Sequence, residues 1–394
     1  VTEYRAAIRK ITAGKHPGKD GIYGEVLQHL NEDMQKVLLQ LINESYTKGM
    51  VPRQWRVEMI IPLPKPGKSA IHIESYRPVC MTSEIAKLAE RLVTCRLSYY
   101  LKANKLIPDS QHGFRSSRST ETALLLVQAQ VISALKAKHR ALMVSIDLSK
   151  AFDTVNIVKL LNNMVKMKVP VVYVKWFTSF LQNRRYTVKV DSSESKSRRF
   201  FNGIPQGSVS GPLLWSIYIT DLHAAVNNVQ QQPAHQNVRT SFGTDLIDKV
   251  SQIHYADDLN FLVSGKEENN IELKMQTVLN EVNNFLDSTD LMLAPGKLTA
   301  ITFTNTNANK NQEYLEERAN LTIGENIITR VRTTKLLGMV LNDSMTAADH
   351  VAMVRKKASN RLTQLSAVVG KSWGMAPAEM RTVYIQYLLS VILY

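Results

Sequence analysis

The apolar residues of two segments recur at every second position, which is the pattern of β-strands with one buried face. In the first segment, residues 141–153, Leu142, Val144 and Ile146 fall on one face of the predicted strand. Asp147 falls on the opposite face, at the end of the strand. A carboxylate at this position points away from the apolar face and is available for chemistry.

The second segment, residues 253–263, alternates in the same way but carries the adjacent acids Asp257 and Asp258 at its centre. Adjacent acids fit a tight turn between two short strands. Burying both carboxylates without partners would be costly, so we expect a cation to meet them. Taken alone, the segment fits a solvated hairpin turn better than a functional site.

A third segment, residues 202–212 (NGIPQGSVSGP), predicts a rigid loop that leads into an apolar helix. Pro212 suits the first turn of that helix, and Gly203, Gly207 and Gly211 allow the backbone to approach a ligand closely. An ordinary loop would have the same composition. The order of an Asp-bearing strand, a Gly-Pro-Gln-Gly loop and an Asp-Asp hairpin is much harder to obtain by chance.

The rest of the chain predicts amphipathic helices joined by irregular segments. Asn31 is suited to cap the start of the first long helix and Gly49 its end. Helices are expected over residues 31–49, from Thr82 or Ser83 onward, and over 266–288, whereas residues 52–80 suggest a Pro-rich, basic hairpin and residues 227–249 a variable loop.

Beyond residue 345 the pattern is again helical, with an apolar stripe and a basic remainder. The stripe consists of Val351, Val354, Ala358, Leu362 and Leu365, and the basic residues are Arg355, Lys356, Lys357 and Arg361. A solvated face is the usual explanation of such a run, although it also suits a phosphate backbone. The basic segment from Arg184 to Arg199 leaves the same two interpretations open.

Composition favours a polyanionic partner. Lys and Arg number 49 against 34 Asp and Glu, which gives a formal charge of +15 and a pI near 9.6. Nucleic acid is favoured over a membrane, because no run approaches the roughly 20 apolar residues that cross a bilayer. Cys80 and Cys95 cannot form a zinc site alone, and we expect both to be buried. No phosphate-loop, histidine-ligand or Ser-His-Asp pattern supports a hydrolase.

The three segments together resemble motifs A, B and C of a reverse transcriptase palm. Five further segments extend the resemblance along nearly the whole chain, and these are residues 16–22 (HPGKDGI), 60–68 (IIPLPKPGK), 75–79 (SYRPV), 111–115 (QHGFR) and 335–339 (KLLGM). They resemble the reverse transcriptases of long interspersed elements, the retrotransposons without long terminal repeats. Two details depart from that family: residues 208–212 read SVSGP where SVLSP is more usual, and Lys297 is followed by Leu298 where Thr or Ser is usual.

The resemblance implies an α+β right-hand polymerase fold with fingers, an antiparallel-sheet palm and a partial helical thumb. The N-terminal extension and fingers would cover residues 1–140, the palm residues 141–345 with a fingers insertion at about 155–200, and the start of a truncated thumb residues 346–394. Motifs A to E would cover residues 141–153, 202–222, 253–263, 291–304 and 334–342.

The resemblance also implies an RNA-directed DNA polymerase that extends a primer 3′-OH with two Mg²⁺ ions, for which Mn²⁺ can substitute. Asp147, the Leu148 carbonyl, Asp257 and Asp258 would hold the ions. Because side chains alternate along a strand, we assign the main role to Asp257 and a peripheral one to Asp258. Lys297 would protonate the pyrophosphate.

The substrate-binding residues follow from the same resemblance. Phe152 would lie under the sugar and exclude a 2′-OH, although plain core packing is its alternative role. Gln206 and Gly207 would contact the nascent base pair or sugar. Lys65 and Arg77 would face the triphosphate. The thumb residues Arg355, Lys356, Lys357 and Arg361 would grip the duplex.

The expected partners are an RNA template, a DNA primer or target and dNTPs, with no membrane. An endonuclease and C-terminal modules are expected in the full-length protein, which would assemble with element RNA in the cytoplasm and act in the nucleus. Two alternatives compete: a catalytically silent relative that only binds nucleic acid, and an RNA-dependent RNA polymerase. The second is disfavoured, since Phe152 would collide with a ribose hydroxyl.

Overall fold

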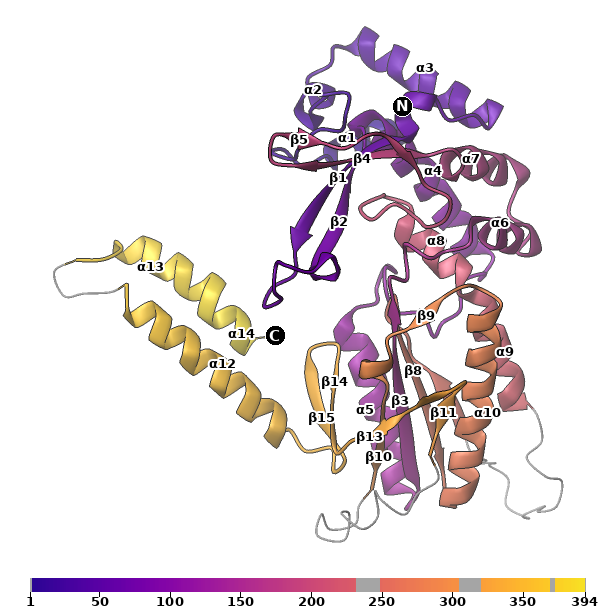
Figure 1. Cartoon of the computed structure of the whole chain (residues 1–394), viewed down its shortest axis with the longest axis vertical. Coiled ribbons are helices and arrows are strands. Elements are labelled where there is room, and N and C mark those ends of the chain that lie inside the picture. Colours follow the sequence, from indigo (N-terminus) through magenta and orange to yellow (C-terminus); the bar gives the residue numbers. More distant parts are fainter. Residues whose placement is uncertain (1, 232–248, 305–319, 369–372, 394) are drawn as a thin grey trace.

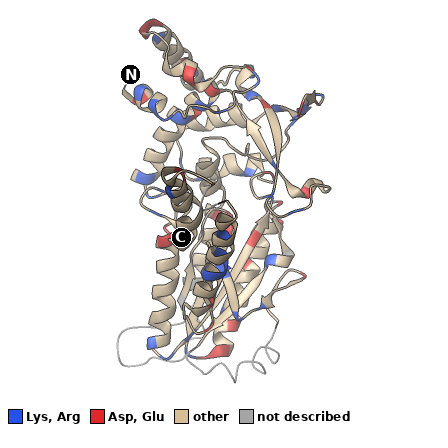
Figure 2. Cartoon of the chain, turned by 90° about the vertical axis from the view of Figure 1, so that its left-hand side faces the viewer, with Lys and Arg blue, Asp and Glu red and all other residues tan. Residues whose placement is uncertain are grey.

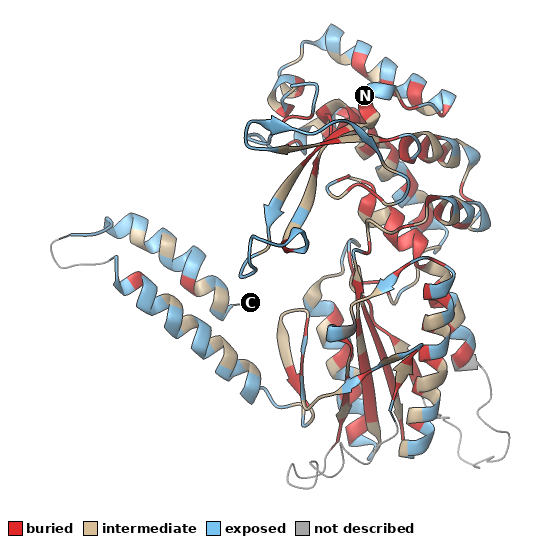
Figure 3. Ribbon diagram, in the orientation of Figure 1, coloured by how far each residue is buried: buried red, intermediate tan, exposed pale blue. Residues whose placement is uncertain are grey.

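The computed structural model describes residues 2–231, 249–304, 320–368 and 373–393. These residues form two lobes, one above the other in Figure 1, and a helical arm that projects from the lower lobe. Buried residues concentrate in the strands of the lower lobe and in the helices between the lobes, whereas the arm is largely exposed (Figure 3). The lower lobe and its junction with the upper lobe therefore contain most of the core.

The lower lobe is built on a sheet with strand order β13-β10-β3-β8-β7. Its strands are β3 (Arg140–Ser149), β7 (Lys249–Gln252), β8 (Asp258–Gly265), β10 (Thr299–Phe303) and β13 (Thr329–Arg330), with the short β9 (Met292–Leu293) on the end of β3. The central strand β3 is antiparallel to both β8 and β10, and only β13 adds a parallel pair. The predicted antiparallel palm sheet is thus confirmed in its central strands.

The alternation of β3 assigns its two faces to two cores. Leu142, Val144 and Ile146 pack in the larger core with α8, α9 and α10, while Ala141 and Met143 pack in a second core under α5. These helices are α5 (Thr120–Lys136), α8 (Gly211–Tyr218), α9 (Thr220–Gln231) and α10 (Glu268–Asp287). The strand pairs β11 (Thr322–Ile323) with β12 (Asn326–Ile327) and β14 (Thr333–Leu336) with β15 (Met339–Asn342) complete the lobe.

The upper lobe combines a second sheet with five longer helices and one short helix. In this sheet β1 pairs antiparallel with β2 and parallel with β4, so segments on both sides of β3 in the sequence meet. The strands are β1 (Val57–Pro64), β2 (Tyr76–Met81), β4 (Arg185–Val190), β5 (Ser193–Glu194) and β6 (Arg198–Arg199). The main helices are α1 (Thr2–Arg9), α3 (Glu32–Lys48), α4 (Glu84–Ala103), α6 (Ile157–Lys166) and α7 (Val171–Leu181), and the short α2 is Gly24–Gln28.

The predicted helix boundaries agree closely with the structure where capping chemistry is local. The Asn31 side chain accepts a hydrogen bond from the Met34 N–H (2.9 Å), and Gly49 ends α3 with φ +63°. Ser83 caps α4 in the same way. The predicted loop 227–249 was partly wrong, since α9 extends to Gln231; residues 232–248 lie outside the described part of the chain.

Two expectations about single residues were wrong. Arg184 is buried and paired with the buried Glu58 of β1, so it ties β4 to β1 and cannot follow a phosphate backbone. Burial is possible for this guanidinium because a carboxylate compensates its charge. Cys80 is buried as expected, but Cys95 lies on the exposed side of α4.

The helical arm consists of α12 (Ala348–Ser366), α13 (Pro377–Val383), a π-helical stretch (Tyr384–Leu389) and α14 (Ser390–Ile392). Of the predicted apolar stripe on α12, Leu365 is buried, but Val351 and Leu362 are 59% and 57% exposed. The predicted helix is confirmed, and much of its apolar stripe is exposed. No helix among the described residues is both long and apolar enough to cross a membrane.

Candidate active site

The three predicted carboxylates meet at the end of the palm sheet that faces the upper lobe. In the register of β3 and β8, Asp147 lies directly opposite Asp258. Opposite residues of an antiparallel pair point to the same face, and the Ser145 hydroxyl confirms this face by donating to Asn260 Oδ1 at 2.7 Å. Asp257 precedes Asp258 in the turn. The register therefore aligns Asp258 with Asp147, while the main ligand role of Asp257 stays a prediction.

Burial and the charges of neighbouring acids raise the pKa values of Asp257 and Asp258. The pKa of Asp258 is raised to about 6, first by burial and then by the charges of Asp257 and Asp147. The pKa of Asp257 is also raised, mainly by burial. Lys297 opposes both shifts. Shifts caused by burial together with nearby charges are typical of functional sites.

Lys297 is the one cation that contacts the cluster among the described residues. Its Nζ lies 2.5 Å from Asp147 Oδ2. The residue stands at the end of a short 3₁₀ turn (Pro295–Lys297) that leads into β10, the neighbour of β3. This contact places the Lys297 ammonium beside the carboxylates, and its role toward pyrophosphate stays a prediction.

Phe152 and the loop between β6 and α8 form the next layer. The Phe152 ring packs against Trp215 of α8 with centroids 5.5 Å apart, and its carbonyl accepts a hydrogen bond from the Ile204 N–H. Gln206 donates through Nε2 to both carboxylate oxygens of Asp153 at 2.9 Å. Gly203 has φ +93°, and a Cβ there would lie 2.6 Å from the Asp153 carbonyl oxygen, so only glycine fits.

Residues of the upper-lobe hairpin formed by β1 and β2 approach Asp153 and the loop before α8. Lys65 follows β1 and lies close enough to Asp153 to lower its pKa, although its Nζ donates to the Glu74 carbonyl at 2.8 Å. Burial is the larger influence and raises the Asp153 pKa overall. Arg77 of β2 is exposed. Gly207 has φ +105° and faces the Cys80 carbonyl, so the loop rests on the end of β2.

Several residues that hold the turn of the two acids, or the start of α8, were missed in the sequence. Gln111 and Trp215 hydrogen-bond to the backbone of Ala256, next to the two acids of the turn. Glu90 of α4 accepts from the N–H and hydroxyl of Ser210, at the start of α8. Gln111 belongs to residues 111–115, which contributed only to the family resemblance, and no local pattern in the sequence predicts the burial of its amide.

The four predicted thumb residues do not all present free side chains. Arg355, Lys356 and Lys357 are exposed on α12, which faces the viewer in Figure 2. Arg361 instead donates to the Tyr387 carbonyl and lies over the Tyr387 ring, 4.6 Å from its centroid. A hollow of about 740 Å³ lies between α12, the C-terminal helical segment and the β14–β15 hairpin. Lys335, Lys357 and Arg361 are among the residues that line it.

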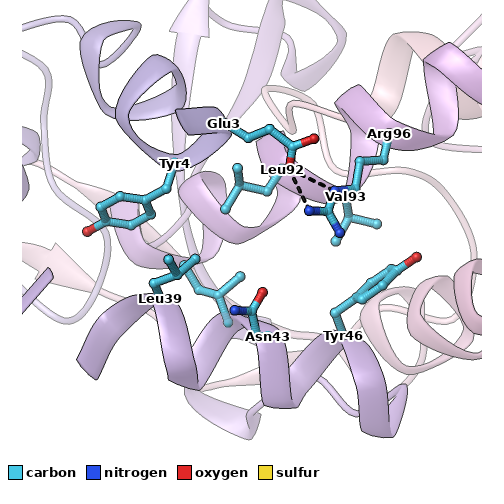
Figure 4. Close-up of a pocket in the computed structure, with 9 residues that line it drawn as sticks. Glu3, Tyr4, Leu39, Asn43, Tyr46, Leu92, Val93 and Arg96 are labelled. Atoms are coloured by element: carbon cyan, nitrogen blue, oxygen red, sulfur yellow. Dashed lines mark hydrogen bonds and ion pairs between the residues drawn. The ribbon is translucent and has the colours of Figure 1, made fainter. Parts of the chain in front are cut away.

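A second hollow lies far from the acids, between α1, α3 and α4 (Figure 4). It encloses about 90 Å³ and is lined mostly by apolar side chains, with the ion pair of Arg96 and Glu3 at its edge. Its residues take no part in the carboxylate site. We interpret it as a packing gap of the N-terminal helices.

Comparison with known proteins shows the family. Residues 63–341 match the reverse transcriptase (RNA-dependent DNA polymerase) family, which is more than half of the chain. The chain belongs to the reverse transcriptase family. All three acids, Phe152 and Gln206 lie within the matched residues, as do the segments that surround them.

The similar curated reverse transcriptases come from mobile elements. A protein described as a probable RNA-directed DNA polymerase from transposon BS of Drosophila melanogaster is 28% identical over the whole chain, and the chain covers 41% of that protein. The RNA-directed DNA polymerase from mobile element jockey of the same species is 26% identical over 96% of the chain and 38% of its own length. These relatives confirm the predicted family, and the chain spans about two fifths of their length.

Among solved structures, apo telomerase from Candida tropicalis, truncated from its C-terminal domain, has a similar fold. The TM-score is 0.50 with 13% identity, over 80% of this chain and 59% of the telomerase chain. Identity at this level supports the fold alone. The right-hand polymerase fold expected for this reverse transcriptase is confirmed.

Proposed function

We propose that the chain is the polymerase part of an RNA-directed DNA polymerase that extends a primer 3′-OH with dNTPs along an RNA template. The observation that carries the proposal is the meeting of Asp147, Asp257 and Asp258 at the open end of the palm sheet. This arrangement stands in a chain of the reverse transcriptase family. We assign residues 1–140 to the N-terminal extension and fingers, 141–345 to the palm and 346–394 to the thumb.

The carboxylates suit Mg²⁺, or Mn²⁺ in its place. No group of three His, Cys, Asp or Glu in the described ranges is closely enough placed to be a preformed metal cage. Mg²⁺ seldom uses such cages, since it keeps several waters and binds through one or two carboxylates with substrate phosphates. A cation bound beside Asp258 would oppose its raised pKa and favour the charged carboxylate. When bound, two such ions lower the pKa of the 3′-OH and stabilise the leaving pyrophosphate.

The chain's own residues would then bind and orient the reactants. Asp147, Asp257, Asp258 and the Leu148 carbonyl would supply oxygen ligands. Lys297 would hold a proton on Nζ within reach of the leaving pyrophosphate, in place of its present contact with Asp147.

The remaining candidates would shape the nucleotide site. Phe152 would lie against C2′ of the sugar, with Trp215 supporting its ring. Gln206 and Gly207 would face the nascent base pair. Lys65 and Arg77 would bind the triphosphate, and the guanidinium of Arg77 is able to do so bidentately.

The decisive experiment is primer extension on poly(rA)/oligo(dT) with dTTP and Mg²⁺. We expect Asp257→Asn to abolish extension while primer–template affinity stays near the wild-type value, because the amide keeps the shape but not the charge. Asp33→Asn on the exposed end of α3 is the matched control and should extend normally.

Near-normal synthesis by Asp257→Asn would eliminate the metal-ligand assignment. A wild-type protein that binds the primer–template without extending it would support the catalytically silent alternative. Efficient use of UTP in place of dTTP would favour an RNA polymerase.

A further inference from the structure

Ala256, the residue before the two acids, has a backbone conformation that alanine rarely adopts. Its φ is +56°, in the left-handed region, where a residue with a Cβ is strained by about 1–2 kcal/mol. Tyr255 and Asp258 close the two-residue turn through reciprocal backbone hydrogen bonds of 3.0 Å. Hairpin turns with a positive φ at this position usually contain glycine. Contacts outside the turn must therefore maintain its shape.

Both backbone polar groups of Ala256 bind side chains from other elements. The Ala256 N–H donates to Gln111 Oε1 at 3.1 Å, and Trp215 Nε1–H donates to the Ala256 carbonyl at 2.8 Å. Gln111 precedes α5 and Trp215 belongs to α8, so the two side chains come from different elements. Both are fully buried.

Gln111 is itself held firmly against the hairpin. Its Oε1 also accepts from the Gly113 N–H at 2.8 Å. The backbones run side by side, with His112 N–H donating to the His254 carbonyl and His254 N–H donating to the Ser110 carbonyl. A Cβ on Gly113 would lie 2.4 Å from the Ala256 nitrogen, which leaves no room for a side chain.

We propose that Gln111 is a positioning residue that locks the turn so that Asp257 and Asp258 face Asp147. The inference rests on the proposed polymerase function and deepens it. A neutral amide suits this position, because it accepts the Ala256 N–H without adding a fourth negative charge to the cluster. Trp215 holds the next peptide unit, through the Ala256 carbonyl, but it also supports Phe152, so Gln111 is the cleaner residue to test.

The consequence for catalysis follows from the geometry that Mg²⁺ demands. This ion requires near-ideal octahedral ligands, so a small displacement of the acids weakens its binding. Without the Gln111 acceptor, the strained Ala256 can relax and carry both neighbouring acids with it. Partners of this kind typically change metal affinity or activity by about 10–100-fold.

The test compares Gln111→Met with Gln276→Met. Methionine is similar in length to glutamine but cannot replace the strong carbonyl acceptor. Gln276 of α10 makes a comparable contact, accepting the Thr322 N–H at 3.1 Å far from the acids. We expect Gln111→Met to lower kcat about 10–100-fold and to raise the Mg²⁺ concentration for half-maximal activation, with little change in primer–template Kd. Gln276→Met should leave all three near the wild-type values.

Hydrogen–deuterium exchange provides a readout that needs no metal. In metal-free buffer, the peptide containing residues 253–258 should exchange faster in Gln111→Met than in the wild type, since the Ala256 N–H loses its acceptor. Unchanged exchange and an unchanged Mg²⁺ requirement would overturn the inference. Loss of activity that only follows a lower Tm, with the wild-type Mg²⁺ requirement, would also overturn it. Absence of extension by the wild type would instead refute the polymerase function.

Discussion

Asp258 lies directly opposite Asp147 in the palm sheet, and the pKa of its carboxyl is raised to about 6. Burial is the largest cause, and the neighbouring acids add to it. The folded protein therefore binds this proton more tightly than the unfolded chain. Stability associated with Asp258 is fully present below the ordinary pKa of 3.8 and is lost as the pH rises through about 6.

We accordingly expect Asp258→Asn to stabilise the metal-free protein at about pH 8, by on the order of 1–3 kcal/mol. The gain should shrink as the pH falls from about 6 to 4, because the wild-type carboxyl becomes neutral in the folded state. Urea unfolding in EDTA at several pH values measures it, with Asp33→Asn as the control. A gain in unfolding free energy that does not depend on pH would contradict the raised pKa of Asp258.

Phe152 is the second residue whose role can be tested alone. Its ring is partly buried and rests on Trp215, so it is held at a defined position beside the acids. A hydroxyl at C2′ would clash with the ring and lose its water without gaining a hydrogen bond. Phe152→Val should therefore raise the use of UTP relative to dTTP.

The measurement is the ratio of kcat/KM for dTTP over UTP in both proteins. Phe303→Val, in the other core of the palm, controls for lost packing and should lower stability without changing the ratio. An unchanged ratio in Phe152→Val would mean that the residue only packs.

At the scale of elements, the basic side chains of α12 differ in whether they contact the rest of the arm or are exposed. Arg361 uses its guanidinium within the arm, on the carbonyl and ring of Tyr387. Arg355, Lys356 and Lys357 are exposed. The exposed apolar side chains Val351 and Leu362 leave the same helix only partly covered. Any contact with a nucleic-acid backbone therefore depends on the three exposed residues.

Replacing Arg355, Lys356 and Lys357 with Ala should flatten the plot of log K against log[salt] for primer–template binding. Each lost phosphate contact is worth about 0.9 of slope on B-form DNA, so the change would reach up to roughly 3 units. Arg361→Ala is the internal control and should change the slope little. Equal slopes in the triple variant and the wild type would identify this face as solvated.

At the scale of the whole molecule, the two lobes are joined through buried polar contacts beside the active site. Glu90 of α4 is fully buried, and burial raises the pKa of its carboxyl. Its Oε1 accepts from the Ser210 N–H at 2.8 Å and from the Ser210 hydroxyl at 2.5 Å. Ser210 occupies one of the positions where the sequence departs from the family pattern, and here its hydroxyl has a specific partner.

Ser210→Ala should lower the free energy of unfolding by about 1–3 kcal/mol, the usual cost of removing one partner of a buried polar group. The remaining N–H keeps the carboxylate partly satisfied, so the fold should persist. Ser366→Ala, which removes an exposed hydroxyl contact at the end of α12, is the matched control. Equal urea midpoints for the two variants would contradict a role for this contact.

The sequence alone determined those features of the structure that depend on residues close together in the chain. Alternation predicted the strand that carries Asp147 and the hairpin that carries Asp257 and Asp258, because burial of one face imposes a period of two. Capping chemistry predicted the ends of α3 at Asn31 and Gly49, and the order of the three motifs identified the family. These features follow from local geometry and from a pattern too specific to arise by chance.

Only the tertiary structure decided which distant groups meet. The bond from Ala256 to Gln111 joins residues 145 positions apart, and the register that aligns Asp258 with Asp147 depends on how two strands pair. The sequence around Arg184 predicts an exposed cation, but its side chain is buried and forms an ion pair with Glu58. Such contacts depend on side chains that approach through the packing of other elements, so no local pattern encodes them.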